Sequence, residues 1–291
     1  MDTEYEKSLK SLETENYWDR NYFRPLGFRI AKALRNTGIT PNAVTIISIF
    51  IGAAAGPLFY PENLALNALG VALLFIANIL DCVDGQLARL TGIKSEIGRI
   101  LDGLAGDIWF ALIYTFLALR LNRQFDTNLF FIPAVLSALS HLLQANITDY
   151  YKTVHLFFIN REKGAEFQNC AEVRRKYAAM KPGIGKVLFY FYLWYTTLQE
   201  TVTPKLQKLL QTLKEKYGDD IPEDLRLSFR RSSSRLMKHC IDMMTFNWRS
   251  LVLYLSVLTG YVWFDFFFEI IILNIILCIS IFKHEKICKK L

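Results

Sequence analysis

The sequence predicts an all-α polytopic membrane protein, and three observations support this fold class. Hydrophobic residues make up 52% of the 291 positions, and the mean hydropathy is +0.21 although 21% of the residues are charged. The apolar residues gather into runs close to the roughly 20 residues that cross a bilayer core. Lys and Arg are absent from some connections, such as 60–63, and concentrated in others. This alternation is typical of membrane proteins whose basic segments face the cytoplasm, so we expect about six transmembrane helices.

Residues 1–42 are expected to form a cytoplasmic lead followed by an interfacial helix. Pro25 suits the first turn of a helix, and Leu26, Ile30 and Leu34 recur every four residues. Such an amphipathic helix lies on the membrane surface. The alternative is that its apolar face packs against a soluble partner.

Residues 43–148 are expected to contain the four transmembrane helices that carry the chemistry, at about 43–60, 64–80, 97–119 and 129–148. The segment Thr40-Pro41-Asn42 can begin the first of them, because Thr is a good N-cap and Pro is favoured in the first turn. Gly52 and Gly56 form a GxxxG stripe in the same helix. Such a stripe allows close packing of a second helix, from this chain or from another copy.

Residues 149–248 are expected to form a basic, helical insertion at the cytoplasmic face, because they hold 17 of the 34 Lys and Arg residues. The apolar stretch 186–198 is short for a span, and a crossing there would place the following basic segment outside, so we expect it to be interfacial or re-entrant. The basic run 230–235 is not accompanied by a recognition module, so no nucleic-acid partner is expected. Residues 249–291 are expected to form the last two spans, about 249–264 and 267–282, and a basic tail.

The acidic residues between 81 and 107 lie where one apolar run ends and the next begins. Asp81 and Asp84 are three residues apart, which places them on one face of a helix, and Gly85 permits a close approach of backbone or ligand. Asp102 lies four residues after Gly98, on one face of the next helix. Carboxylates gathered at one point favour a hard cation such as Mg²⁺ or Mn²⁺.

These residues resemble the signature of the CDP-alcohol phosphatidyltransferase family, D-x-x-D-G-x-x-A-R followed by eight residues and G-x-x-x-D-x-x-x-D. The matching positions are Asp81, Asp84, Gly85, Ala88, Arg89, Gly98 and Asp102. The fourth Asp of the family falls at Gly106, and the nearest carboxylate belongs to Asp107. On a regular helix Asp107 points about 140° away from Asp102, whereas position 106 points about 40° away.

The resemblance implies a membrane enzyme that transfers a phosphatidyl-type or ceramide-phosphate group from a CDP-linked lipid to an alcohol, such as inositol phosphate, and releases CMP. It implies Mg²⁺ or Mn²⁺ as cofactor and a homodimer among membrane lipids, and the distribution of Lys and Arg predicts an active site on the cytoplasmic side. Asp107 and Asp102 are the expected catalytic pair, with Asp107 as general base. The expected metal ligands are Asp81, Asp84, Asp102 and Asp107; the expected nucleotide-binding residues are Asn42, Asp81, Gly85, Ala88, Arg89 and Gly98; and Lys152 is the expected acceptor-binding residue.

Several alternatives remain open on the sequence alone. The donor can carry the headgroup on CDP and transfer it to a lipid hydroxyl. The intramembrane carboxylates can instead mark an ion pathway, or the chain can be a silent partner subunit, which Gly106 favours. At single residues, Asn42 can be a helix cap, Lys152 can be a snorkelling lysine, and the acids can pair with Arg89, Lys94 and Arg99.

Overall fold

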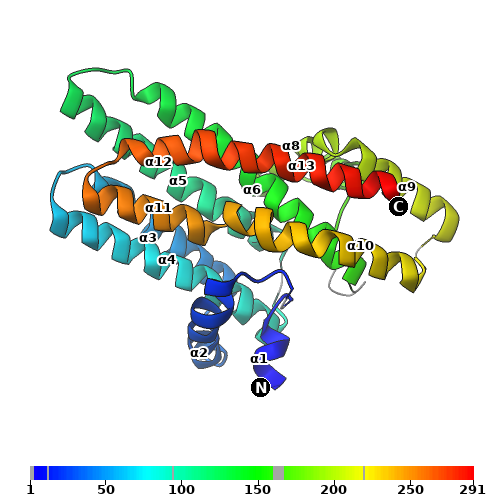
Figure 1. Ribbon diagram of the computed structural model, residues 1–291. Coiled ribbons are helices and arrows are strands. Elements are labelled where there is room, and N and C mark those ends of the chain that lie inside the picture. Colours follow the sequence, from blue (N-terminus) through cyan, green and yellow to red (C-terminus); the bar gives the residue numbers. More distant parts are fainter. Residues whose placement is uncertain (1–2, 12, 94, 160–166, 219) are drawn as a thin grey trace. The chain divides into compact units, whose positions relative to one another are not determined.

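The computed structural model describes residues 3–11, 13–93, 95–159, 167–218 and 220–291 (Figure 1). Every regular element in these ranges is a helix, and no strand occurs in them, which confirms the all-α prediction. The chain divides into two compact units. Unit 1 comprises 1–143 and 246–272, and unit 2 comprises 144–245 and 273–291. The division into four segments made from the sequence remains a prediction.

Unit 1 holds the N-terminal helices, three long helices and part of the C-terminal region. Its elements are α1 (Thr3–Ser8), the π-helical turn η1 (Asp19–Phe23), α2 (Arg24–Leu34), α3 (Pro41–Phe59), α4 (Leu64–Thr91), α5 (Glu96–Phe125), the first part of α6 (Phe131–Ile159), α11 (Phe246–Thr259), α12 (Trp263–Phe267) and the π-helical turn η4 (Phe268–Ile272).

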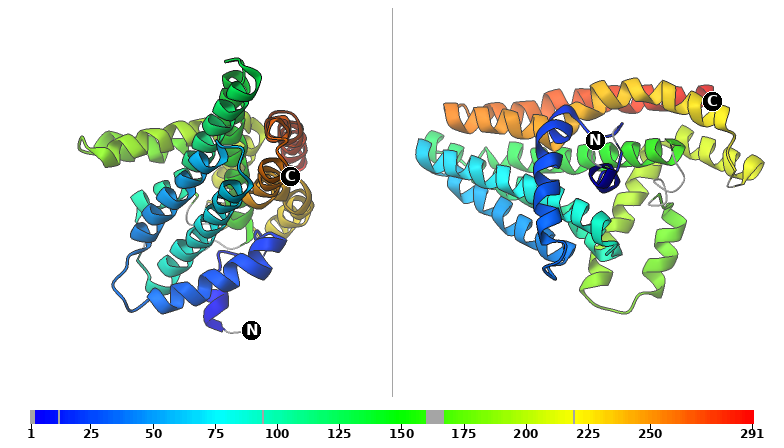
Figure 2. Two further views of the ribbon diagram at one scale, coloured as in Figure 1. Left: turned by 90° about the vertical axis from the view of Figure 1, so that its left-hand side faces the viewer. Right: turned by 90° about the horizontal axis from the view of Figure 1, so that it is seen from below.

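Unit 2 holds the rest of α6 and the basic insertion. Its other elements are α7 (Cys170–Ala179), α8 (Ile184–Val202), α9 (Pro204–Tyr217), α10 (Glu223–Leu236), the π-helical turn η2 (Met237–Ile241), the 3₁₀ turn η3 (Asp242–Met244) and α13 (Leu273–Lys290). Within this unit α7 packs beside α8, and α13 contacts both α9 and α10 (Figure 2).

Five helices in the described part of the chain are long and apolar enough to cross a membrane: Pro41–Phe59, Leu64–Thr91, Glu96–Phe125, Phe131–Ile159 and the continuous run Trp263–Lys290. They correspond to five of the six expected spans. The sixth, expected near 249–264, corresponds to α11, which has only 14 residues and is short of the roughly 20 that a bilayer core requires. Six spans are therefore not confirmed. The interfacial positions of α2 and of α8 remain predictions.

Side-chain caps begin the three helices that form the centre of unit 1. The Thr40 side chain accepts a hydrogen bond from the backbone N–H of Ala43, Asn63 caps α4, and Ser95 caps α5. α4 ends at Thr91 and is capped by Gly92, whose φ of 73° lies in the left-handed region that favours glycine. Because Gly92 and Ser95 are so close in sequence, the end of α4 and the start of α5 are held near one another.

The packing of α3 against α4 and α5 forms the core of unit 1, with α2 crossing α4 (Figures 1 and 2). A Cβ atom at Gly52 would overlap the indole of Trp109, and one at Gly56 would lie 3.0 Å from the ring of Phe116. The GxxxG stripe of α3 therefore receives α5 of the same chain. Trp109 and its neighbours Phe59, Leu74, Ile113 and Leu117 are buried there, and their apolar area supplies the main stabilisation of the unit.

Candidate active site

Three aspartates from two helices meet at the junction of α4 and α5. One carboxylate oxygen from each of Asp81, Asp84 and Asp102 lies within 4.8 Å of the others. Asp84 is buried, Asp81 is half-buried and Asp102 is exposed. Anionic groups this close repel one another unless a cation or protons neutralise them. Because all three donors are hard oxygen atoms, the residues present fit Mg²⁺ or Mn²⁺.

Thr45 fixes the buried member of this cluster. Its hydroxyl donates a hydrogen bond to Asp84 Oδ2 over 2.5 Å, and it also lies 3.1 Å from the carbonyl of Pro41. The α3 helix thereby orients a carboxylate that belongs to α4. The sequence contains Thr45 three residues after Asn42 but did not reveal that Asp84 is its partner. That contact joins residues 39 positions apart.

Asn42 lies at the start of α3, against the start of α5. Its Nδ2 donates to Ser95 Oγ over 3.2 Å, and the backbone N–H of Gly98 donates to the same hydroxyl over 2.9 Å. A Cβ atom at Gly98 would overlap Asn42 Oδ1 and lie 2.8 Å from Ser95 Oγ. Glycine is therefore required at position 98 for the two helix starts to approach. Asn42 and Gly98, both expected at the nucleotide site, are side by side.

Arg89 lies across Gly85 on the surface of α4. Its Nε donates to the carbonyl of Ser8 over 2.5 Å, and its Nη2 lies 3.2 Å from the position that a Cβ atom on Gly85 would occupy. Gln86 reaches the same N-terminal residue, because its Nε2 donates to Ser8 Oγ over 3.1 Å. Ala88 is half-buried on this helix. The N-terminal segment thus holds the predicted nucleotide-binding arginine in place, and the sequence contains no signal for this contact.

Arg24 supplies positive charge that acts electrostatically on Asp81. Its Nε lies 3.1 Å from Glu15 Oε2. Burial on its own lowers the pKa of Arg24, but the nearby carboxylates of Glu15 and Asp19 help to outweigh this effect, and the pKa is raised above its usual value. The Arg24 guanidinium therefore stays charged.

Asp107 points to a different set of partners in the interior of unit 1. Its Oδ1 lies 3.4 Å from His141 Nε2, and its buried Oδ2 has no hydrogen-bond partner in the described chain. Arg249 bonds both His141 and Glu269. Among the described residues Asp107 is not part of the group formed by the other three aspartates. Its predicted roles as fourth ligand and general base therefore rest on the sequence resemblance.

Gly106, which occupies the position of the family's fourth Asp, has room around it. A Cβ atom built there would meet no described atom within 4 Å, apart from its chain neighbours and the backbone of its own helix. Position 106 can therefore accept a side chain. The glycine is not required by packing, in contrast to Gly98.

For two lysines named from the sequence, Lys152 and Lys94, the described structure gives no contact with the three aspartates. Lys152 is half-buried on the part of α6 that belongs to unit 2. Lys94, one of the cations considered as a structural partner of the acids, lies outside the described residues. The sequence did not single out His141, Arg249 and Glu269. Ionisable residues within otherwise apolar runs were the signal that could have identified them.

The three-aspartate site lies within the part of the chain that matches a known protein family. The family model described as CDP-alcohol phosphatidyltransferase matches residues 38–198, more than half of the chain. That region contains four of the five helices long enough to cross a bilayer. The chain is therefore an integral, multi-pass membrane protein.

Two curated relatives match shorter segments. The archaetidylinositol phosphate synthase of Pyrococcus horikoshii is 43% identical over 74 residues, which is 25% of this chain and 38% of that protein. The ceramide phosphoethanolamine synthase of Drosophila melanogaster is 38% identical over 81 residues, 25% of this chain and 21% of that protein. The chain thus matches well under two thirds of the length of either relative.

Proposed function

The chain belongs to the CDP-alcohol phosphatidyltransferase family, and on this premise we propose that it transfers a substituted phosphate group from a CDP-linked donor to a hydroxyl group and releases CMP. The observation that carries this proposal is the meeting of Asp81, Asp84 and Asp102 within 4.8 Å. In the reaction a bond forms between the acceptor oxygen and phosphorus. The bond between that phosphorus and CMP breaks, and the hydroxyl proton passes to a base.

The proposed donor is a lipid linked to CDP, carrying a phosphatidyl-type or ceramide-phosphate group, and the proposed acceptor is an alcohol headgroup such as inositol phosphate. The name of the Pyrococcus relative, an archaetidylinositol phosphate synthase, supports this direction. The alternative direction moves a headgroup from CDP to a lipid hydroxyl. The name of the Drosophila relative, a ceramide phosphoethanolamine synthase, keeps this alternative open because its product is a ceramide lipid.

Asp81, Asp84 and Asp102 are proposed to hold Mg²⁺ or Mn²⁺. When bound, the divalent cation neutralises the diphosphate and stabilises the departing CMP. Thr45 keeps the Asp84 carboxylate oriented through its 2.5 Å hydrogen bond. Such partners of ligating carboxylates fix ligand geometry.

The nucleotide is proposed to bind beside these acids. Gly85 and Ala88 are small residues that allow the nucleotide to approach α4 closely. The guanidinium of Arg89 is proposed to contact a phosphate. Asn42 and Gly98 lie together at the starts of α3 and α5, and the positive end of a helix dipole favours an anionic ligand.

Asp107 is proposed as the general base, with Asp102 as its catalytic partner. His141 engages Asp107 Oδ1 at 3.4 Å, and Oδ2 is buried without a hydrogen-bond partner in the described chain, so this role requires the acceptor hydroxyl to reach Oδ2. Asp107 is also a candidate fourth metal ligand. Asp107 is proposed for both roles because the family's fourth Asp is replaced here by Gly106, which has no carboxylate.

We place the active site on the cytoplasmic side because the basic segments follow the positive-inside pattern. Lys152 is proposed to hold the phosphate of the acceptor as a point charge, on the strength of its sequence context. A homodimer is proposed from the family resemblance.

The test is release of CMP by the purified chain in detergent. CDP-diacylglycerol is supplied with a panel of alcohols that includes inositol phosphate, and in a separate series a CDP-linked headgroup is supplied with ceramide or diacylglycerol. Each reaction is run with Mg²⁺, with Mn²⁺ and with EDTA. We expect CMP release that requires the divalent cation and one of the acceptors.

The matched pair of variants is Asp102→Asn and Asp126→Asn. Both change an exposed carboxylate near an end of α5, but Asp126 follows the far end of the helix and has a positive φ that Asn tolerates. Asp102→Asn is expected to lose transfer and Asp126→Asn to keep it. Equal transfer by wild type and Asp102→Asn would remove the enzyme proposal.

An ion-translocating function is the second candidate, and the buried ionisable residues of unit 1 favour it. Asp107, His141, Arg249 and Glu269 lie in a chain of contacts inside this unit. The same purified protein in sealed vesicles distinguishes the two functions. Cation or proton flux without CMP release supports translocation, whereas CMP release without flux supports transfer.

A further inference from the structure

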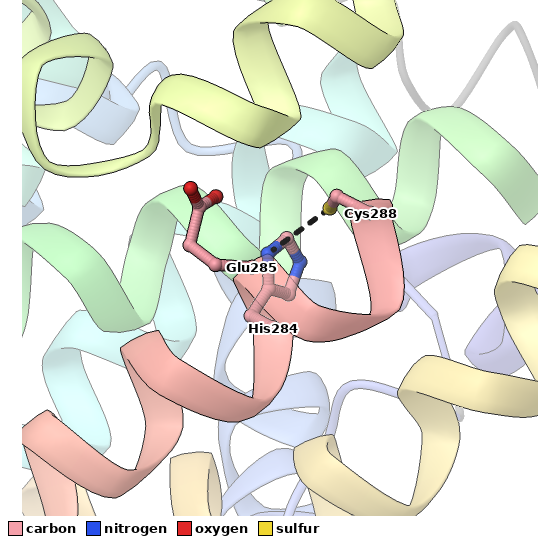
Figure 3. A group of neighbouring side chains, drawn as sticks. All are labelled: His284, Glu285 and Cys288. Atoms are coloured by element: carbon pink, nitrogen blue, oxygen red, sulfur yellow. Dashed lines mark hydrogen bonds between the residues drawn. The ribbon is translucent and has the colours of Figure 1, made fainter. Parts of the chain in front are cut away.

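A second cluster of potential metal ligands lies in unit 2, near the end of α13. His284 and Cys288 are one helical turn apart on this helix, and Glu285 is adjacent to His284 (Figure 3). One donor atom from each of the three lies within 4.8 Å of the others. This group contains nitrogen, oxygen and sulfur, and no residue of it belongs to the three-aspartate site.

The spacing of the two closest donors suits a shared ion. Cys288 Sγ lies 3.6 Å from His284 Nδ1 (Figure 3). In a tetrahedral zinc site, bonds of about 2.3 Å to sulfur and about 2.0–2.1 Å to nitrogen separate these two ligand atoms by about 3.5 Å. The pair therefore needs almost no rearrangement to chelate Zn²⁺. The same distance also fits an S–H···N hydrogen bond between the two side chains.

Burial and stacking hold the imidazole of His284 in one orientation. The residue is completely buried, at 0% exposure, with the ring of Tyr151 stacked on it at 3.9 Å. Its Nε2 has no hydrogen-bond partner in the described chain. Because Nε2 lies on the opposite side of the ring from Nδ1, it is not a ligand of the ion. In the tautomer that carries the ring proton on Nε2, the lone pair of Nδ1 faces Cys288.

Glu285 is held in place by the start of α9. Its Oε2 accepts from the backbone N–H of Lys205 over 2.8 Å, and its Oε1 accepts from that of Leu206 over 3.2 Å. Its carboxylate is directed away from the ring of His284 toward the neighbouring helix (Figure 3). Carboxylates that ligate metals are commonly hydrogen-bonded to an outer group of this kind, and each oxygen keeps a second lone pair.

We propose that His284, Glu285 and Cys288 bind one Zn²⁺ ion in unit 2. A thiolate with an imidazole selects Zn²⁺ over Mg²⁺, which prefers oxygen ligands. Binding displaces the thiol proton of Cys288 to solvent. Through Glu285 the ion connects the end of α13 with the start of α9, and three protein donors leave the fourth position of a tetrahedral site open.

Co²⁺ serves as the probe, because a Co²⁺–thiolate bond gives an absorption band that binding to oxygen ligands does not. The full chain is purified in detergent, stripped of metal and titrated with Co²⁺, and the band is then displaced with Zn²⁺ or challenged with excess Mg²⁺. We expect about one Co²⁺–thiolate centre per chain, displaced by Zn²⁺ and not by Mg²⁺. The absence of a thiolate band in the wild-type protein overturns the proposal, without any variant.

The matched cysteine variants are Cys288→Ser and Cys278→Ser. Both cysteines lie on α13, but Cys288 is buried and Cys278 is exposed. Cys288→Ser is expected to abolish the band, and Cys278→Ser to leave it unchanged. Persistence of the band in Cys288→Ser, or its loss in Cys278→Ser, overturns the assignment.

Glu285→Gln provides a further test that does not depend on the folding of Cys288→Ser, because glutamine retains an oxygen for one of the two α9 backbone N–H groups. The affinity for Co²⁺ is expected to fall by roughly 10- to 100-fold. Wild-type affinity in this variant overturns the three-ligand assignment.

Discussion

The two ligand clusters differ in chemistry, exposure and origin. The three-aspartate cluster of unit 1 has only oxygen donors, comes from two helices and includes the exposed Asp102. The cluster of unit 2 mixes nitrogen, oxygen and sulfur, comes from one helix and is buried throughout. A hard, accessible oxygen site suits an ion that shares its ligands with a phosphate substrate. A buried site with a thiolate suits Zn²⁺ rather than Mg²⁺.

The largest expected effect separates the two clusters directly. Asp84→Asn removes the charge of the buried ligand in unit 1, and the proposed transfer is expected to fall on the order of 10⁴-fold, because the cation's contribution of several kcal/mol is lost. CMP release measures this loss. The Co²⁺–thiolate band of the same variant is expected to match wild type. Loss of both signals together would show that the clusters are not independent.

The next effect concerns Asp107, which lies apart from the three-aspartate group. Asp107→Asn is expected to lower turnover roughly 10²- to 10³-fold, as for removal of a general base, with CMP binding retained. The double variant Gly106→Asp with Asp107→Asn is expected to recover part of this loss, because a Cβ atom at position 106 meets open space. Initial rates and CMP-binding titrations check both. Unchanged turnover in Asp107→Asn excludes it as the base.

A third change tests the interior support of unit 1. Arg249→Leu breaks a buried ion pair and leaves Glu269 without that cation, which is expected to lower the free energy of unfolding by roughly 3–5 kcal/mol. The control is Arg123→Leu, because Arg123 forms an exposed pair with Glu62, and exposed ion pairs contribute little to stability. Denaturant unfolding in detergent compares them. Equal stabilities would mean that the buried pair gives no more support than the surface pair.

The smallest expected effect sharpens the role of Thr45. Thr45→Val removes the hydrogen bond to Asp84 at nearly constant volume, and the affinity for Mn²⁺ is expected to fall roughly 10- to 100-fold. Thr115→Val is the control, since the Thr115 hydroxyl donates to a carbonyl of its own helix, that of Ala111, at an exposed position. Mn²⁺ titrations measure the difference. If both variants bind Mn²⁺ alike, Thr45 does not position the ligand.

Much of this fold follows from local sequence. Runs of apolar residues predicted the long helices, and Thr40 with Pro41 predicted the start of α3, because caps and periodicity are local properties. The spacing of Asp81 and Asp84 placed both on one face. The structure adds Asp102 from the next helix, as the resemblance implied.

The contacts that support the site were not predictable in the same way. Ser8 and Arg89 are 81 positions apart, and Arg249 and His141 are 108 apart. Such pairs depend on how helices pack, and no local pattern specifies a partner at that distance. The sixth span was expected because residues 249–264 are apolar. The helix that forms there, α11, has only 14 residues, so apolar composition alone does not predict a span.

The glycines of α3 bear on how two copies of this chain can associate. The side chains of Trp109 and Phe116 pack against Gly52 and Gly56 within the same chain. A helix of a second copy therefore cannot pack on these two glycines. A dimer contact has to use another surface, and substitutions at these glycines will report on the folding of a single chain. Crosslinking that probes self-association is therefore best directed at the exposed face of α3 around Ile46, Ile47 and Phe50.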